Sequence, residues 1–175
     1  MLGIAEPAVT MSEAQAYVRI ETGEEEAVLA GLIRTASALC EAFINQVVIE
    51  RNFAEDLAAS GGWERLTAIP TRSISDVQGI DENGNASPLM TGDYCVDIVS
   101  SGDGWVRVSD SARFSRVRVS GSAGLASSEN EVPEPIRQGI LRLVAHLFTA
   151  RDGSGGDPPA AVTALWRPYR RMRLR

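Results

Sequence analysis

Residues 23–45 have the sequence GEEEAVLAGLIRTASALCEAFIN, and this stretch decides much of the fold. Its apolar residues recur at intervals of three and four, which is the period of an α-helix. They form one continuous stripe: Val28, Leu29, Leu32, Ile33, Ala36, Leu39, Cys40, Phe43 and Ile44. A stripe this wide is typical of a helix face buried in a core rather than of a binding groove. The sequence therefore predicts a long helix over residues 23–45 with this stripe buried.

Signals for the ends of helices divide the rest of the helical sequence. The capping box at residues 22–25 predicts the start of the long helix. A second box at residues 12–15, with Ser12 as N-cap, predicts a short helix over 12–20. Pro133 and Pro135 stand where prolines are tolerated at a helix entrance, and the helical spacing that follows predicts a second long helix over 135–150. A break rich in glycine and proline at 151–159 precedes a last short helix over 160–166.

The middle of the chain, residues 47–121, changes to an apolar period of two, which is typical of strands. The apolar or alternating runs are 47–49, 63–69, 94–99, 105–108 and 114–120. In the last run Val117 and Val119 face one way, while Arg116 and Arg118 face the other. Asn83-Gly84 and the turn at 101–104 predict hairpins, so the sheet is expected to be antiparallel. The predicted class is α+β: a helical bundle of two long and two short helices with a central antiparallel β insertion.

The composition favours one globular domain with its own core. No run of about 18 continuous apolar residues and no signal peptide are evident, so we expect a protein of the cytoplasm without a membrane span. Cys40 and Cys95 are each interpreted as a buried free thiol rather than as a disulfide or metal ligand. The single histidine, His146, lies in an apolar helical run and is interpreted as structural.

The charge is distributed unevenly. All 17 basic residues are arginines and the net charge is −6, yet residues 167–175 carry five arginines and no acid. The rest of the chain is therefore strongly acidic and a poor general binder of nucleic acid, whereas the short basic end can bind one acidic surface on a partner.

No catalytic motif emerges from the sequence. A phosphate-binding loop requires a lysine, and the chain has none. Ser122 lacks the Gly-x-Ser-x-Gly pattern of a nucleophile elbow. The acidic pairs at 55–56, 81–82 and 129/131 are expected in loops or at edges, where solvated carboxylates need no functional explanation. Residues 81–85 fit a hairpin turn better than a calcium loop. We therefore predict a protein that is not an enzyme and has no cofactor or metal.

Several landmarks follow one another along nearly the full chain. They begin with Pro7-Ala8-Val9 and the helix 12–20, the acidic residues 24–26 before residues 28–33, and Cys40-Glu41-Ala42-Phe43. They continue with residues 79–84, Tyr94-Cys95-Val96-Asp97, residues 132–140, residues 143–151 and residues 165–170. In their order these landmarks resemble the head–tail connector (adaptor) family of long-tailed double-stranded DNA phages and gene-transfer agents. The glycine-rich 151–159 break departs from the simple charged loop of many relatives.

The resemblance implies a structural virion protein of the particle neck, assembled in the bacterial cytoplasm. Such a protein forms a homo-oligomeric ring, taken as dodecameric, that joins the portal of the capsid to the stopper or tail proteins and lines the DNA exit channel without sequence-specific binding. A stopper, a tail terminator, a DNA-binding module that uses the arginine tail and a small enzyme are the alternatives.

Under this reading residues 1–157 form a single connector domain and residues 158–175 form a portal-docking arm behind a glycine hinge at 153–156. Trp166 and Tyr169 are the expected anchors, because aromatic and arginine side chains often anchor interfaces. The full expected portal-binding set is Leu165, Trp166, Arg167, Tyr169, Arg170, Arg171 and Arg173. The alternative is a terminal helix that folds back on its own core. Arg116 and Arg118 are candidates for contacts with a neighbouring subunit, with solvated surface charges as the alternative.

Overall fold

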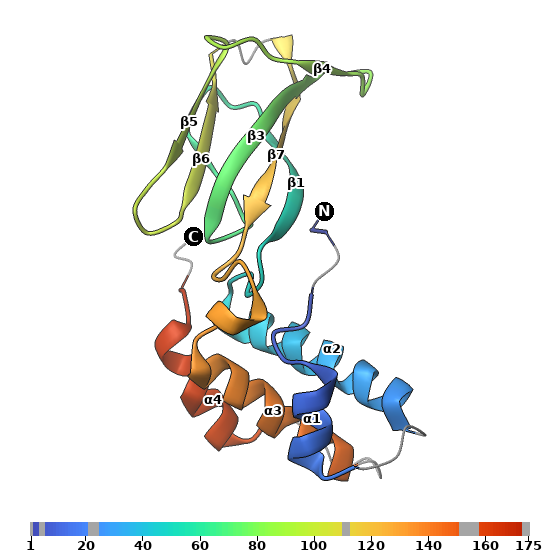
Figure 1. The fold of residues 1–175 in the computed structure, drawn as a ribbon. Helices are drawn as coiled ribbons and strands as arrows, with labels where there is room; N and C mark the ends of the chain where they lie inside the picture. Colours follow the sequence, from blue (N-terminus) through green and yellow to red (C-terminus); the bar gives the residue numbers. More distant parts are fainter. Residues whose placement is uncertain (1, 4–5, 21–24, 110–112, 151–157, 173–175) are drawn as a thin grey trace. The chain divides into compact units, whose positions relative to one another are not determined.

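The computed structural model describes residues 2–3, 6–20, 25–109, 113–150 and 158–172. The chain divides into two compact units. A helical unit contains the described residues of Glu6–Ile49 and Ala126–Arg175, and a β unit contains Glu50–Leu125 with Leu2 and Gly3. Figure 1 labels the elements of both units. The predicted α+β class is confirmed.

The helical unit consists of α1 (Met11–Val18), α2 (Glu26–Ile44), α3 (Glu134–Thr149) and α4 (Ala160–Trp166). Two short 3₁₀ turns, η3 (Glu129–Glu131) and η4 (Arg167–Tyr169), precede α3 and follow α4. Both long helices were predicted close to their observed bounds. The predicted break at 151–159, with its glycine hinge, falls mostly outside the described residues.

The cap of α1 differs from the prediction. Thr10, not Ser12, is the N-cap, because its hydroxyl accepts the Glu13 N–H at 3.1 Å while the Glu13 carboxylate accepts the Thr10 N–H at 2.8 Å. Thr10 and Glu13 form the complete reciprocal box, which starts the helix one residue earlier than predicted. The predicted box at 22–25 lies largely outside the described residues.

One apolar core fills the helical unit. From α2 it takes Leu29, Ile33, Ala36, Cys40 and Ile44, and α3 and α4 add Ile136, Ile140, Leu143, Val144, Val162 and Trp166. The predicted burial of the α2 stripe is therefore confirmed for one side of the helix. It is wrong for Val28 and Leu39, which are 49% and 39% exposed.

The β unit has two antiparallel sheets. One has the strand order β1-β7-β3-β4, with β1 (Arg51–Ala58), β3 (Thr71–Ile80), β4 (Ala86–Pro88) and β7 (Arg116–Ala123). The other has the order β2-β6-β5, with β2 (Glu64–Arg65), β5 (Tyr94–Ile98) and β6 (Gly104–Val108). Both sheets contribute buried side chains, among them Phe53, Val77, Val117 and Val119 from the first and Val106 and Val108 from the second.

Both predicted hairpins are confirmed. Gly84 closes the turn between β3 and β4 at φ +85°, and Gly102 lies in the turn between β5 and β6 at φ +82°. These positive φ values suit glycine, which has no Cβ to clash. Val117 and Val119 are buried while Arg116 and Arg118 are exposed, as the alternation predicted.

The prediction of a strand at 47–49 was wrong, and the predicted run at 63–69 is a strand only at Glu64–Arg65. Residues 47–49 form no strand, because Val47, Val48 and Ile49 are buried next to the end of α2 and only Ile49 makes an isolated bridge, to Ala126. The acidic pair Glu55-Asp56, expected in a loop or at an edge, lies within β1. β1 is an edge strand of its sheet, and an edge strand tolerates charged side chains.

Candidate protein-binding surfaces

Trp166, an expected anchor of the C-terminal arm, is a core residue. Its side chain is 0% exposed, its ring centroid lies 5.9 Å from that of Phe43, and its Nε1 donates to the Ile136 carbonyl at 3.3 Å. The ring rests on α3 where Gly139 has no side chain, since a Cβ there would lie 2.1 Å from Nε1. Trp166 is therefore buried in its own subunit rather than presented to a partner, as the alternative of a folded-back helix predicted.

The residues after α4 continue along the C-terminal end of α2. The Arg171 N–H donates to the Ile44 carbonyl at 2.9 Å, and the Gln46 side chain donates to the Tyr169 carbonyl at 2.6 Å. The Arg170 guanidinium lies 5.5 Å from the centre of the Phe43 ring. The last carbonyls of a helix have no partner within the helix and carry partial negative charge, so an N–H donor and nearby cations stabilise this end. Residues 158–172 thus belong to the helical unit, which differs from the expected separate arm.

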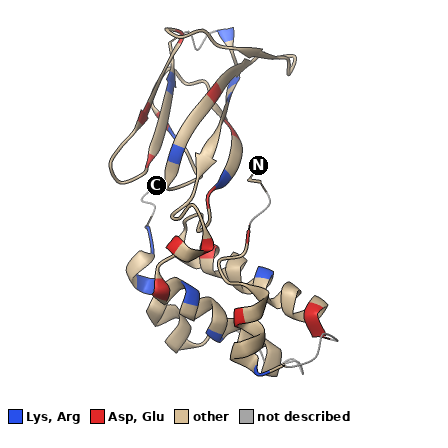
Figure 2. Ribbon diagram, in the orientation of Figure 1, with Lys and Arg blue, Asp and Glu red and all other residues tan. Residues whose placement is uncertain are grey.

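The described members of the predicted portal-binding set fall into three groups by burial. Arg167 and Arg170 are exposed, while Leu165, Tyr169 and Arg171 are half-buried. Trp166 is buried, and Arg173 lies outside the described residues. Figure 2 marks the arginines along this C-terminal segment. Of the predicted set, the side chains that a partner can reach without rearrangement are therefore those of Arg167 and Arg170.

Arg118, a candidate for contacts between subunits, already has a partner in its own chain. Its Nε and Nη2 donate to the two carboxylate oxygens of Asp56 at 2.6 and 2.8 Å, across the β1–β7 pairing. The hydrogen bond from Arg118 lowers the pKa of Asp56. Arg116 reaches the same carboxylate only at 4.0 Å, and its side chain is 56% exposed. Of the two arginines, Arg116 is the more available to a neighbour.

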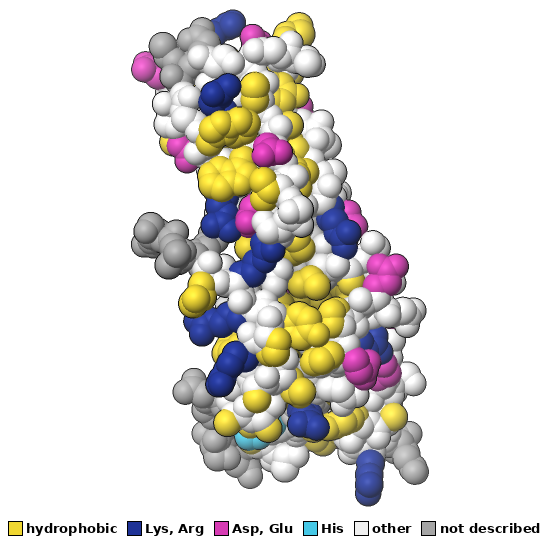
Figure 3. All heavy atoms as spheres, turned by 90° about the vertical axis from the view of Figure 1, so that its left-hand side faces the viewer, with side chains coloured by type: hydrophobic (Ala, Val, Ile, Leu, Met, Phe, Trp, Pro, Cys, Tyr) yellow, Lys and Arg dark blue, Asp and Glu magenta, His cyan; other side chains and the backbone are white. Residues whose placement is uncertain are grey.

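One face of the β2-β6-β5 sheet carries a surface that the sequence reasoning missed. The Arg107 guanidinium lies 5.2 Å from the centre of the Trp63 ring, and that of Arg65 lies 5.9 Å from the centre of the Trp105 ring. Arg65 also bonds Asp103 at 2.6 Å. Figure 3 shows apolar side chains among arginines on this side of the β unit. The alternation in Trp105-Val106-Arg107-Val108 was the available signal, because residues two apart share a face of a strand.

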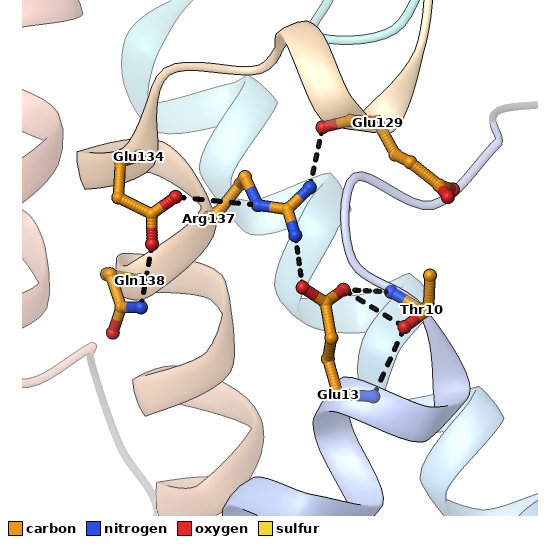
Figure 4. Close-up of polar contacts among 6 residues, drawn as sticks. All are labelled: Thr10, Glu13, Glu129, Glu134, Arg137 and Gln138. Carbon is orange, nitrogen blue, oxygen red and sulfur yellow. Dashed lines mark hydrogen bonds and ion pairs between the residues drawn. The ribbon is translucent and has the colours of Figure 1, made fainter.

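A polar network within the helical unit is centred on Arg137 (Figure 4). Arg137 donates to the Glu129 carbonyl at 2.6 Å, bonds the Glu13 carboxylate and lies 3.7 Å from the Glu134 carboxylate. Its side chain is 13% exposed. The Glu13 pKa is lowered, first by the backbone hydrogen bond from Thr10 and also by Arg137. Since every member is bonded within the unit, the network ties α1 and η3 to α3.

The remaining chemistry of the described residues is sparse. No group of three or more His, Cys, Asp or Glu among them could hold a metal ion. An open hollow of about 440 Å³ lies in the β unit, and its lining, from Leu2, Gly3, Phe53, Ser75, Ser120 and neighbours, has no titratable side chain. Cys40 is buried, but Cys95 is exposed on β5, so its expected burial was wrong. Cys95 shares this exposure with the rest of β5, in which Tyr94 is half-buried and the other residues are exposed.

Comparison with known proteins gives structural matches only. No protein-family model matches the chain, and no curated protein matches it. Among solved structures, a chain in the neck of an empty GTA particle computed with C6 symmetry aligns with TM-score 0.77 and 23% identity, over 99% of this chain and 97% of that one. A chain in the virion of the native gene transfer agent particle gives TM-score 0.76 and 22% identity, with the same coverage of both chains.

A chain in the neck of the native GTA particle computed with C12 symmetry also matches, with TM-score 0.72, 21% identity and again 99% and 97% coverage. At such identities the likeness establishes a shared fold. It extends over both units, since nearly all of each chain is aligned.

Proposed function

We propose that this chain is a structural, non-enzymatic component of the neck of a phage-like or gene-transfer particle. The observation that carries the proposal is the full-length likeness in fold to chains of GTA particles, at 99% of this chain and 97% of theirs. A fold alone hosts many functions, so the coverage matters. A shared domain inside unrelated proteins would leave part of one chain unmatched, whereas here both units and their connections correspond.

Within the neck, the proposed role is that of the head–tail connector, an adaptor ring between the portal and the stopper or tail proteins. The necks with chains of this fold were computed with six- and twelve-fold symmetry, which supports a ring of identical copies, with twelve as the expected number. DNA would pass through the ring without sequence-specific contacts. A stopper or tail terminator is the alternative within the same particle, because the matched structures contain the neck rather than one protein of it.

The proposed portal contact is the C-terminal segment, and its arginines rather than its aromatic residues make the main contacts. Arg167 and Arg170 are exposed, so they can pair with carboxylates of a partner while α4 stays in its core. Tyr169, Leu165 and Arg171 border them, and Arg173 continues the basic sequence. Trp166 acts in this scheme as the support that holds the segment on α3.

Reversal of the exposed charges tests this contact without removing core residues. Arg167→Glu combined with Arg170→Glu should abolish co-purification with portal and lower the melting temperature of the subunit only slightly, through the lost contact of Arg170 with the Phe43 ring. The matched control, Arg19→Glu with Arg142→Glu, makes the same change in charge at exposed positions of the same unit and should still bind. Portal binding that survives in the Arg167→Glu, Arg170→Glu variant would refute the assignment.

The neighbours of the chain in the particle decide between the roles. Cryo-electron microscopy of the particle neck should find a ring of this chain directly on the portal. Density for the chain only on the tail side of another ring would favour a stopper or terminator, and its absence from particles would refute the neck role. A DNA-binding module predicts DNA affinity that falls steeply with salt, while the connector predicts little affinity at any salt.

A further inference from the structure

Helix α2 is apolar on two opposite sides. It is the one described helix long and apolar enough to cross a membrane by length and composition, with mean hydropathy 1.6 over the best window, of which only 28% is buried. A core helix of a soluble protein passes the same test, but such a helix is mostly buried. A helix that is hydrophobic all round normally has all of its faces covered. The outer side of α2 is therefore an apolar surface that lacks a cover among the described residues.

The outer side has the spacing of a helix-packing seam. Val28, Gly31, Thr35, Ala38 and Ala42 follow one another at intervals of three, four, three and four, and Leu39 adjoins them. None of these six side chains is charged, and each is exposed or half-buried. A repeat of 3.5 residues keeps one face of a helix along a single partner helix, and small side chains permit a close approach. We call these six residues the α2 seam.

The buried side of α2 identifies what the seam can bind. Leu29, Ile33, Ala36, Cys40 and Ile44 pack into the core of the helical unit, so α2 cannot leave to span a bilayer without emptying that core. A helix of 19 residues is about 28 Å long and about 10 Å wide, so its face supplies only part of the roughly 800 Å² that each partner buries in a standard interface. The seam thus fits one strip of a larger protein interface.

We propose that the α2 seam is where a second copy of this chain, the next subunit in the ring, packs a helix of its helical unit. This inference rests on the proposed function, because a ring gives every subunit an identical neighbour on each side. A ring contact joins two different surfaces of the chain, whereas a contact of the seam with itself would close as a dimer.

Charges placed on the seam test the proposal. Thr35→Glu with Ala38→Glu changes two exposed positions. Glutamate is a better helix former than threonine and a slightly poorer one than alanine, so the two effects offset each other and the free subunit should keep its circular dichroism spectrum and melting temperature. Ring formation, measured by native mass spectrometry, and incorporation into particle necks should both be lost. The control, Ser12→Glu with Ala16→Glu on the exposed side of α1, should assemble as the wild type does.

A cross-linking probe identifies the neighbour. Ala38→Cys in a Cys95→Ser background carries a benzophenone maleimide, since Cys40 is buried. Irradiation of assembled necks should yield an adduct with twice the mass of the chain that contains only its own peptides. An adduct with another neck protein overturns the proposal, and so does the lack of any adduct from a fully labelled subunit. An adduct with lipid, when the labelled subunit is irradiated with vesicles of bacterial phospholipid, also overturns it.

Two further results also have defined meanings. A wild-type chain that assembles only as a closed dimer overturns the ring contact. If the wild-type chain is absent from necks, the proposed function itself fails. If it is present while the glutamate variant also enters necks normally, only the seam assignment fails.

Discussion

Gly139→Ala tests whether α4 is seated in the core of the free subunit. Gly139 lies within α3, and a methyl group at this position would be 2.1 Å from Nε1 and 2.7 Å from Cε2 of Trp166. Real Cβ contacts are not this short, so something must move. The indole is fully buried, bonded to the Ile136 carbonyl and backed by Phe43, so it is not the free end of a flexible side chain.

The sign of the effect separates the two arrangements of the C-terminal segment. Alanine in place of glycine stabilises an unobstructed helix by about 1 kcal/mol. Overpacking a core costs typically about 1–3 kcal/mol, and losing the burial of a tryptophan costs of order 3–5 kcal/mol. A seated α4 therefore predicts a net loss of roughly 0–2 kcal/mol if the core is overpacked, and of roughly 2–4 kcal/mol if Trp166 leaves the core. The melting temperature falls by up to about 16 °C. An arm that is free in solution predicts a rise.

Gly31→Ala is the matched control for this measurement. Gly31 is in α2, and a Cβ there meets only the Arg34 side chain, at 4.0 Å, so the melting temperature should rise slightly. Thermal unfolding by far-ultraviolet circular dichroism gives the melting temperatures. Trp166 fluorescence in a Trp63→Phe, Trp105→Phe background reports whether the indole has left the core. If Gly139→Ala raises the melting temperature as Gly31→Ala does, the seated α4 is refuted.

Three further predictions concern the polar network and the thiols. Arg137→Gln should cost about 1–3 kcal/mol in urea denaturation because it leaves Glu13 and the Glu129 carbonyl without their charged donor, and an effect no larger than that of Glu134→Gln would contradict the role of the network. Because the pKa of Glu13 is lowered in the folded protein, the unfolded chain binds the Glu13 proton more readily. The stability that ionised Glu13 adds to the fold is therefore present above the ordinary pKa of 4.5, and it is lost as the pH falls through the lower folded pKa. Glu13→Gln should therefore flatten the acid side of a plot of stability against pH, and an unchanged slope would count against it. A thiol reagent should label Cys95 in the folded protein and Cys40 only after denaturation, because burial raises the pKa of the Cys40 thiol and blocks access; rapid labelling of both would contradict the described core.

The sequence predicted the parts of the fold whose signals are local. α2 and α3 have helical periodicity over many turns, and the Gly84 and Gly102 turns need positive φ. β1 was missed because its sequence, RNFAEDLA, has only Phe53 buried, and an edge strand need not alternate cleanly. Conversely, residues 47–49 are β-branched and apolar because they are buried beside helices. Composition alone cannot distinguish apolar residues buried in a sheet from apolar residues buried beside helices.

The interaction surfaces were harder to predict because they depend on contacts between distant residues. An aromatic and basic end after a glycine-rich break describes a free arm and a docked helix equally well. The distinguishing feature is that Gly139 has no side chain, which leaves room for the Trp166 ring on α3. This fit can be recognised only when α4 is seen to lie on α3. In the same way, the sequence predicted Arg118 on the exposed face of a strand but gave it no partner. Its pairing with Asp56 depends on the register of β1 and β7. The α2 stripe was recognised, but its division into a buried and an exposed side depends on which helices surround it.

The docked C-terminal segment also makes the proposed portal contact testable at the level of mechanism. If Trp166 had to leave its core to bind the portal, undocking would cost of order 3–5 kcal/mol, and the affinity would fall in proportion to the small undocked fraction. Gly139→Ala weakens docking, so in that case it should increase portal affinity, by about tenfold for each 1.4 kcal/mol of docking energy removed. If Arg167 and Arg170 bind while α4 remains seated, no such gain is available, and a displaced segment should bind equally or more weakly. Titration of the wild type and of Gly139→Ala against purified portal by calorimetry therefore distinguishes the two routes, and a tighter complex with Gly139→Ala would refute binding through the docked segment.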